Sequence, residues 1–182
     1  MTSQNNTPAT PAQTLAQTAA DTTADTTAAD TRVHFATLAS MQDLVGQHLA
    51  TSPWVLVDQQ RIDGFAEATG DHQWIHVDVE RAKAGPYGTP IAHGFLTLSL
   101  LPELAATAMC IDDVTMSINY GLNKVRFTGV VPVGSRLRGV IRLKAWLVIE
   151  RGVQMTTEVV IEREGHDKPV CIAEAVSRRF TA

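Results

Sequence analysis

One stretch decides the fold: Ile91-Ala92-His93-Gly94-Phe95-Leu96-Thr97-Leu98-Ser99-Leu100-Leu101-Pro102-Glu103-Leu104-Ala105-Ala106-Thr107-Ala108-Met109. From Phe95 to Glu103 it lacks the polar stripe that a surface helix turns toward water, and a helix that is apolar on all sides is buried. The apolar run is shorter than the roughly 20 residues that cross a bilayer. We therefore predict a helix that the rest of the protein encloses, where each buried Leu or Phe contributes roughly 1.5–3 kcal/mol of stability.

The start of this helix is a candidate oxyanion site. Gly94 lets bare backbone approach a ligand, the first four N–H groups of a helix have no partner within it, and the helix dipole favours negative charge there. A buried helix that begins at His93-Gly94 can therefore stabilise an oxygen on which charge develops during a reaction. The alternative is structural: Gly94 permits a tight turn, and His93 is a core histidine whose hydrogen bonds are satisfied.

Length and composition predict one domain with a real core, because the chain has 182 residues of which 45% are hydrophobic. The net charge of −4 argues against a general nucleic-acid-binding protein. Two cysteines, Cys110 and Cys171, do not make a disulfide framework, so a reducing cytoplasm is the expected compartment. We find no transmembrane segment and no signal peptide, and we expect no membrane partner.

The N-terminal segment differs in composition from the rest. Residues 1–32 are rich in Ala and Thr and offer too little apolar surface to offset their ordering entropy, which predicts a disordered tail. A mitochondrial transit peptide is rich in Arg and poor in acidic residues, whereas Asp21, Asp25 and Asp30 precede the first Arg here. Residues 33–182 are then predicted to form the single folded domain.

The first half of that domain is mainly helical. Periodicity predicts helices at 41–45, 59–68 and 79–84 and a strand at 54–57. Asp58 and Asp78 stand where side chains cap the second and third helices, and Gly70 stands where the second helix ends.

The second half is predicted to be a sheet. After Ile111 the period of the apolar residues changes from helical to strand-like, and it predicts strands at 115–119, 122–127, 136–150, 153–163 and 169–180. The first two of these strands are joined through Tyr120-Gly121. Helices followed by an antiparallel meander indicate the α+β class, with a sheet that can wrap the apolar helix.

Asp71 and His76 lie five residues apart between two predicted helices, where functional groups are often found. A carboxylate and an imidazole held together can share a water molecule, because one orients it while the other takes its proton. The structural alternative is that Asp71 caps or bonds locally and that His76 is a partly buried histidine bonded to the backbone.

A metal and a nucleotide cofactor are both unsupported. His72, His76, Asp78 and His93 are a possible ligand set, but their spacing matches no common zinc signature, and Cys110 and Cys171 stand isolated in the sequence. Glycine-rich phosphate-binding patterns and a Gly-x-Ser-x-Gly elbow are absent from the sequence. Ser99 lies on the core helix, where its hydroxyl is expected to bond a carbonyl of the preceding turn. We expect neither a metal nor a cofactor.

Two blocks of sequence carry a family resemblance. Ala68-Thr69-Gly70-Asp71-His72-Gln73-Trp74-Ile75-His76-Val77-Asp78, followed by Tyr87-Gly88-Thr89-Pro90-Ile91-Ala92-His93-Gly94-Phe95-Leu96-Thr97-Leu98-Ser99-Leu100, resembles the MaoC-like (R)-specific enoyl-CoA hydratases, in the subgroup of nodulation-protein-N-like dehydratases. The segments 119–127 and 131–135 resemble the same family. The match runs from about Gln42 to Phe180. It implies the hotdog fold, a long central helix wrapped by a curved antiparallel sheet, usually as a homodimer.

The resemblance also implies roles for individual residues. Asp71 and His76 match the pair that activates a water molecule, and Gly94 matches the glycine whose backbone N–H binds the thioester carbonyl. Ser99 matches a serine that lines the site, and His93 and Gln73 stand beside these positions. Many relatives have Asp-x-Asn-Pro-x-His, whereas Gln73 and Trp74 replace the Asn and Pro here. Trp74 is bulky enough to reshape the acyl channel, so the difference bears on substrate choice more than on reaction type.

The resulting hypothesis is reversible hydration of a trans-2-enoyl thioester to the (R)-3-hydroxyacyl thioester, without a cofactor other than the carrier of the substrate. That carrier is coenzyme A or an acyl carrier protein. A hotdog thioesterase and a non-catalytic acyl-thioester-binding module are the alternatives. Lys124 and Arg126 are candidate contacts for the phosphates of coenzyme A, although a solvated strand face explains them equally well.

Overall fold

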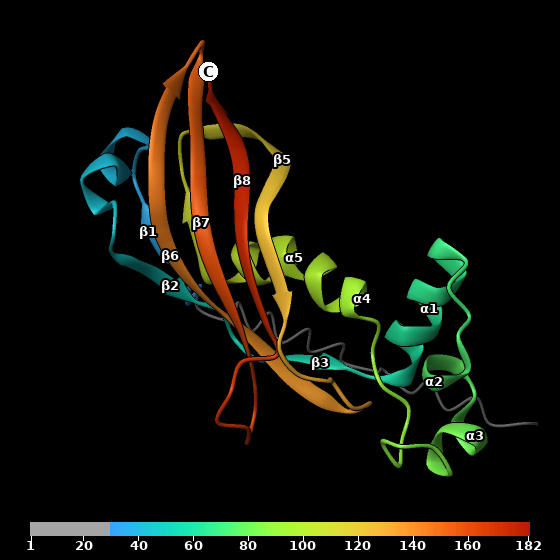
Figure 1. Cartoon of the computed structure of the whole chain (residues 1–182). Helices are drawn as coiled ribbons and strands as arrows, with labels where there is room; N and C mark the ends of the chain where they lie inside the picture. The colour runs from blue at the N-terminus through green and yellow to red at the C-terminus, as the bar shows by residue number, and fades with distance from the viewer. Residues whose placement is uncertain (1–29) are drawn as a thin grey trace, which may run out of the picture. The chain divides into compact units, whose positions relative to one another are not determined.

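Long antiparallel strands form where the sequence alternates between apolar and polar residues (Figure 1). The computed structural model describes residues 30–182, so the predicted tail, residues 1–32, lies almost entirely outside the described residues. A six-stranded sheet has the order β2-β6-β7-β8-β5, and β3 also pairs with β6. The strands are β2 (His48–Thr51), β3 (Val55–Val57), β5 (Val114–Phe127), β6 (Ser135–Ile149), β7 (Gly152–Arg163) and β8 (Cys171–Thr181).

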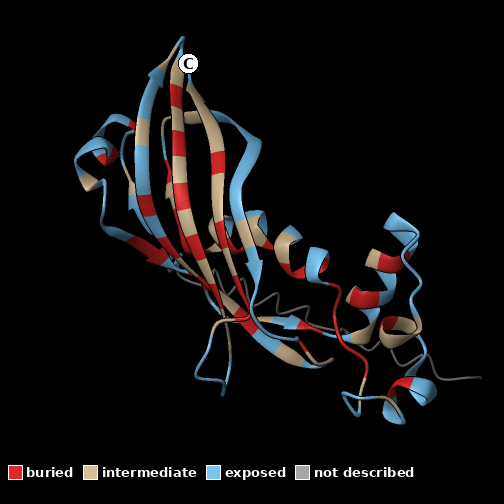
Figure 2. Ribbon diagram, viewed as in Figure 1, coloured by how far each residue is buried: buried red, intermediate tan, exposed pale blue. Residues whose placement is uncertain are grey.

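Helices α4 (Gly94–Ser99) and α5 (Leu101–Ala108) lie against one face of this sheet (Figure 1). The core fills the space between them, and in β7 every second residue from Val153 to Ile161 is buried (Figure 2). Gly139 of β6 lets α5 approach, because a Cβ there would lie 3.2 Å from the Cβ of Leu104. The antiparallel sheet on a central helical segment agrees with the α+β, hotdog prediction.

The remaining elements precede or flank the central helices. A 3₁₀ helix, η1 (Ala39–Leu44), is followed along the chain by α1 (Gln59–Thr69), α2 (Trp74–Val77) and α3 (Val79–Lys83). Strand β1 (Val33–Phe35) pairs in parallel with β4 (Met109–Ile111), directly after α5. Within the described residues, no helix is both long and apolar enough to cross a membrane.

The predicted helix boundaries that depend on capping are confirmed. The side chain of Asp58 accepts a hydrogen bond from the backbone N–H of Arg61, and Asp78 accepts one from Arg81. Gly70 ends α1 in the left-handed conformation with φ of 77°. These contacts are local, so the sequence alone contains what is needed to predict them.

The prediction for the central helix is wrong in two respects. The segment is interrupted at Leu100, since Pro102 has no N–H to donate to the carbonyl four residues earlier. It is also not enclosed on all sides, because Phe95 is 67% exposed. Within residues 30–182, the sheet covers the segment on one side, and the opposite side, where Phe95 lies, is exposed.

Two local predictions also need correction. Residues 114–127 form one strand rather than two, and the sequence irregularity around Tyr120-Gly121 appears as register shifts in its pairing with β8, between Asn119 and Gly121 and between Leu122 and Lys124. Such bulges keep a strand paired while changing the face that its side chains take. The stretch around His76, for which no helix is predicted, contains the short helix α2.

Candidate active site

His76 is fixed by two hydrogen bonds and is only 6% exposed. Its Nδ1 lies 2.6 Å from the backbone carbonyl oxygen of Ile91, and the side-chain amide of Gln59 donates to the backbone carbonyl of His76 at 2.8 Å. Because a carbonyl oxygen can only accept, Nδ1 carries the proton and the neutral ring keeps its lone pair on Nε2. The tautomer is therefore the one that presents Nε2 as a base.

His93, the residue before α4, connects the two sequence blocks in space. Its Nε2 donates to the backbone carbonyl oxygen of Asp71 at 2.9 Å, and its ring stacks on that of His76 with centroids 3.7 Å apart. The ring of Phe65 also contacts it, at 5.0 Å between centroids. Its Nδ1 is buried and has no hydrogen-bond partner among residues 30–182. The purely structural alternative, a fully satisfied core histidine, thus accounts for only one of its two nitrogens.

Asp71 lies at the solvent edge of this pair of rings. Its Oδ1 accepts a hydrogen bond from the backbone N–H of Gln73 at 3.4 Å. A carboxylate oxygen of Asp71 and one ring nitrogen each of His76 and His93 all lie within 4.8 Å of one another. A water molecule that makes hydrogen bonds of roughly 2.8 Å can bridge groups at this separation. The carboxylate and the imidazole are therefore placed to hold one water molecule between them.

The surroundings keep His76 in its basic form. Desolvation by burial lowers the pKa of the imidazole below its ordinary value of 6.5, the hydrogen bond to Ile91 opposes that change, and His93 lowers the pKa further. The charge of Asp71 acts in the raising direction and is the smallest of the four influences. The ring is consequently neutral at pH 7, as a general base must be.

Gly94 contributes the amide that follows the stacked ring of His93. Among the described residues, no acceptor takes a hydrogen bond from this N–H, so it is available to a ligand. A Cβ at this position would lie 3.3 Å from the ring of Phe127, tighter than most contacts of that kind. Because Gly94 has no side chain, a ligand can reach its backbone N–H through the narrow space beside the Phe127 ring.

A cavity of about 450 Å³ lies between α4, α5 and the sheet. Ser99 is on its wall together with Leu98 and Leu101, and most of the other lining residues are apolar. The hydroxyl of Ser99 donates to the carbonyl of Phe95 at 2.7 Å, as its position on a helix predicts. The cavity is large enough for an acyl chain, since ligand pockets typically measure roughly 300–1,000 Å³.

Lys124 and Arg126 are not brought into this group. They line a smaller cavity of about 170 Å³ together with Glu158 and Glu174. Glu158 alternates along β7 with two residues that line the larger cavity, which places the small cavity on the other face of the sheet. The contact of these two cations with the phosphates of coenzyme A therefore remains a prediction that this geometry does not support.

The two residues that depart from the family pattern have different surroundings. Gln73 is exposed at the start of α2, and its backbone N–H is the part that reaches Asp71. Trp74 lies under the guanidinium of Arg81, 4.4 Å from the ring centroid, and its ring is 3.0 Å from where a Cβ on Gly85 would lie. Trp74 packs against the α3 region and is not among the residues on the wall of the 450 Å³ cavity.

Asp71, His76 and His93 could in principle ligate a metal, since their donor atoms are close together. The two rings are stacked with only 28° between their planes, so their in-plane lone pairs run side by side instead of meeting at one point. A metal needs ligands that converge on it. The arrangement suits a shared water molecule better than an ion.

Sequence reasoning missed the backbone and amide groups that orient His76. Gln59 carries no motif, and the carbonyl of Ile91 has no side-chain signal at all. Ile91 belongs to the second sequence block, but nothing in that block indicates that its backbone carbonyl orients His76. No sequence pattern indicated that Phe65 contacts His93 or that Phe127 lies beside Gly94, because each phenylalanine comes from an element distant in sequence.

Comparison with known proteins gives a consistent picture. The MaoC like domain family matches residues 40–165. A protein named 3-hydroxyacyl-thioester dehydratase Z from Mycobacterium tuberculosis is 49% identical over 145 residues, which are 79% of this chain and 96% of that protein. Nodulation protein N from Rhizobium leguminosarum bv. viciae is 44% identical over 148 residues, covering 80% of this chain and 92% of that protein.

Solved structures show the same fold. The R-hydratase PhaJ1 from Pseudomonas aeruginosa, in its unliganded form, has a TM-score of 0.60 and 25% identity, covering 76% of this chain and 83% of that one. An (R)-hydratase from A. caviae has a TM-score of 0.57 and 23% identity, over 73% of this chain and 94% of that one. At that identity the second likeness concerns the fold alone.

Proposed function

The chain belongs to the MaoC-like family of hydratases and dehydratases, enzymes of the hydro-lyase class, and we propose that it interconverts trans-2-enoyl and (R)-3-hydroxyacyl thioesters. The relatives named as a 3-hydroxyacyl-thioester dehydratase and as an R-hydratase support this substrate class. The observation that carries the proposal is that one ring nitrogen of His76 lies within 4.8 Å of an Asp71 carboxylate oxygen, on a ring whose Nδ1 bonds to the carbonyl of Ile91.

The reaction follows from these positions. In the hydration direction, Asp71 orients a water molecule and His76 Nε2 accepts one of its protons while the oxygen attacks Cβ of the enoyl group. Negative charge then develops on the thioester oxygen, and the N–H of Gly94 stabilises it at the start of α4. A proton from the Asp71–His76 pair is delivered to Cα and completes the addition. General acid–base groups of this kind typically contribute about 10²–10⁴ each to the rate.

The wall of the cavity indicates where the acyl chain extends. The apolar cavity of about 450 Å³ lies beyond the helix that begins at Gly94, and its wall includes Leu98, Ser99 and Leu101. An acyl chain whose thioester is held at Gly94 can therefore bury its tail between α5 and the sheet. Trp74 packs elsewhere, so we assign chain-length selection to the cavity wall and not to the Trp74 substitution.

A second copy of the chain is the proposed partner. Strand β5 is the last strand of the described sheet and pairs only with β8 there, and unpaired edges of long strands favour association. Large apolar side chains are exposed along it and beside it: Met116, Ile118, Tyr120, Leu122, Phe127 and Phe95. Several large apolar side chains exposed along one strand are typical of an interface. A homodimer would cover the open side of α4 and α5.

Two assays on one purified sample separate the candidate functions. A hydratase removes the absorbance of the enoyl thioester of crotonyl-CoA without releasing thiol, and its product has the R configuration. A thioesterase releases free coenzyme A, which a thiol-reactive dye detects, and a binding module does neither while still binding the ligand. We expect loss of enoyl absorbance without thiol. Thiol release at the rate of absorbance loss, or binding without turnover, would overturn the proposal.

The carrier of the acyl group is tested in the same way. The hydration rate of crotonyl-CoA is compared with that of crotonyl-acyl carrier protein. A series of longer enoyl chains is then measured on the carrier that reacts faster. The apolar cavity predicts activity beyond four carbons, because its walls are apolar well past Ser99.

A further inference from the structure

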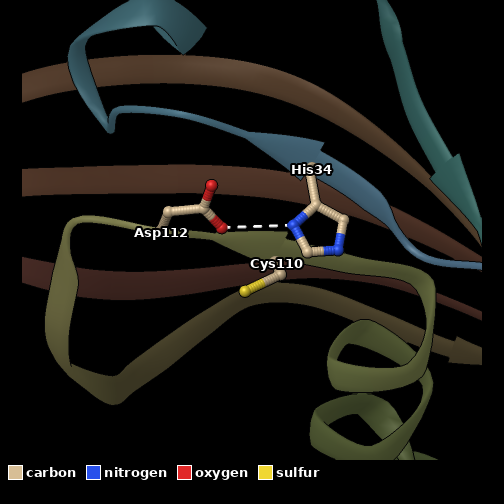
Figure 3. Close-up of side chains that lie close together, drawn as sticks. All are labelled: His34, Cys110 and Asp112. Carbon is tan, nitrogen blue, oxygen red and sulfur yellow. Dashed lines mark hydrogen bonds and ion pairs between the residues drawn. The ribbon is translucent and has the colours of Figure 1, made fainter. Parts of the chain in front are cut away.

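Three side chains from two distant parts of the sequence meet at the far end of the central helices. In the parallel pair β1–β4, His34 is in register with Cys110, and Asp112 follows Cys110 by two residues (Figure 3). His34 Nδ1 lies 3.2 Å from Asp112 Oδ1. One ligand atom of each of the three residues lies within 4.8 Å of the others. Cys110 stands isolated in the sequence, but in the folded chain two other possible metal ligands, His34 and Asp112, lie beside it.

The backbone around this group is held firmly. The N–H of Asp112 donates to the carbonyl of Phe35 at 3.0 Å, which continues the β1–β4 pairing beyond its last registered pair. The side chain of Asp113 accepts a hydrogen bond from the N–H of Leu38 at 2.7 Å. Both contacts join the two segments that carry the three side chains, so their relative positions do not depend on a flexible loop.

We propose that His34, Cys110 and Asp112 form a binding site for a zinc-like divalent transition metal. Imidazole nitrogen, thiolate sulfur and carboxylate oxygen are the three donor types that zinc uses. Tetrahedral zinc with bond lengths of roughly 2.0–2.3 Å separates its ligand atoms by about 3.3–3.6 Å. The distances here need to contract only modestly, and the side chains of His34 and Asp112, 46% and 51% exposed, have room to do so.

The donor set also predicts which metals are rejected. A thiolate and an imidazole favour zinc, cobalt and similar ions, whereas magnesium and calcium prefer sites made of oxygen alone. Three protein ligands leave the fourth position to water or to another group. The site joins β1 to the strand that follows α5, so a bound ion would pin the N-terminal strand to the end of the central helices.

This site is separate from the chemistry proposed above. Both central helices, α4 and α5, lie along the chain between Gly94 and the strand that carries Cys110. A thiolate–metal signal can be assigned to Cys110, because the other cysteine is not accessible to a metal ion. Cys171 is fully buried, and that burial raises the pKa of its thiol to about 11.

Cobalt(II) titration of the full-length, tag-free protein tests the proposal. We expect a thiolate-to-cobalt charge-transfer band with one-to-one stoichiometry, displaced by zinc and unaffected by magnesium. Loss of an outer-shell partner already costs about 10–100-fold in metal affinity, so Cys110→Ser should remove the band and weaken zinc binding at least tenfold. His34→Gln should weaken binding while retaining the band at high cobalt.

Two variants serve as controls. His166→Gln changes an exposed histidine in a distant turn, and His76→Ala removes one histidine of the Asp71–His76–His93 group, which contains no cysteine. Both should bind cobalt like the wild type. The proposal is overturned if the wild type shows no thiolate band, or if Cys110→Ser binds zinc as tightly as the wild type with circular dichroism unchanged. Equal weakening by His166→Gln and His34→Gln would also overturn it.

Discussion

The imidazole rings of His76 and His93 are stacked, with centroids 3.7 Å apart and 28° between their planes. One ring donates to the carbonyl of Ile91 and the other to the carbonyl of Asp71, so each has its orientation fixed by a backbone oxygen. The stack brings together the two sequence blocks that carry the family pattern. It also places the His93 ring where it helps to lower the pKa of His76.

We expect His93→Gln to shift the acid limb of the pH–rate profile to higher pH. The amide can still donate to the Asp71 carbonyl, but the ring that helps to lower the pKa of His76 is gone. The measurement is kcat/KM for crotonyl-CoA against pH. The control is His72→Gln, which replaces an exposed histidine next to Asp71. An unshifted acid limb in His93→Gln would show that His93 does not lower the pKa of His76.

The wild-type enzyme should lose both activity and stability on acidification. The pKa of His76 is below 6.5 in the folded protein, so between that lowered pKa and 6.5 the unfolded state binds more protons. The contribution of His76 to stability is therefore fully present above 6.5 and is lost as the pH falls through the folded pKa. Urea unfolding and kcat/KM measured between about pH 5 and 8 check both trends. In His76→Ala the corresponding part of the pH dependence of unfolding should disappear.

Gly94→Ala should reduce activity more than stability. The added Cβ lies 3.3 Å from the ring of Phe127, which is 45% exposed and can move, so we expect the free energy of unfolding to change by less than about 1 kcal/mol. The amide stays in place but its approach is narrowed. The rate should fall about tenfold, short of the 10²–10³ expected for loss of a donor.

Gly64→Ala is the matched control for that variant. Gly64 is also helical, and a Cβ there meets nothing within 4 Å. It should leave the hydration rate unchanged. Equal hydration rates in the two alanine variants would remove Gly94 from the proposed site.

Phe95→Ser should weaken the proposed dimer. Phe95 is 67% exposed and makes an edge-to-face contact with Phe127 at 5.9 Å, so it is the most prominent apolar group on the open side of α4. Light scattering after size exclusion should show a larger monomer fraction at low protein concentration. Leu56→Ser, at 49% exposure on β3, is the control on the opposite edge of the sheet. Identical masses for both variants and the wild type would refute this interface.

The parts of the fold that were predictable depend on neighbours in sequence. Asp58 caps α1 by reaching Arg61, three residues on, and Gly70 ends that helix by its own backbone conformation. Strand β7, and β6 as far as Leu143, follow from alternation between buried and more exposed residues along the segment. These features require no knowledge of what lies across the fold.

The parts that were not predictable depend on contacts between residues that are distant in the sequence, or on surfaces that the described residues leave uncovered. His34 and Cys110 meet through three-residue strands that carry no alternation to detect. Lys124 takes the outer face because a bulge shifts the register after Leu122. Phe95 was expected to be buried, and within one chain nothing among the described residues covers it fully.

The residues of the candidate site could be predicted from the sequence, but their hydrogen bonds and relative positions could not. The two sequence blocks supplied Asp71, His76, His93 and Gly94, and the structure places the first three within reach of one another. The tautomer of His76 depends on a backbone carbonyl, which no side-chain pattern reveals. Ser99 carries both expected features, a hydrogen bond to the preceding turn and a place on the cavity wall.

The most direct measurement is the hydration rate of crotonyl-CoA by the wild type, Asp71→Asn, His76→Ala and the double variant, each checked for folding by circular dichroism. If the two residues share one water molecule, each single variant falls by at least about 10². The double variant then falls little further than the worse single variant, because groups that act as a unit are not additive. Near-wild-type rates in both single variants would contradict the account.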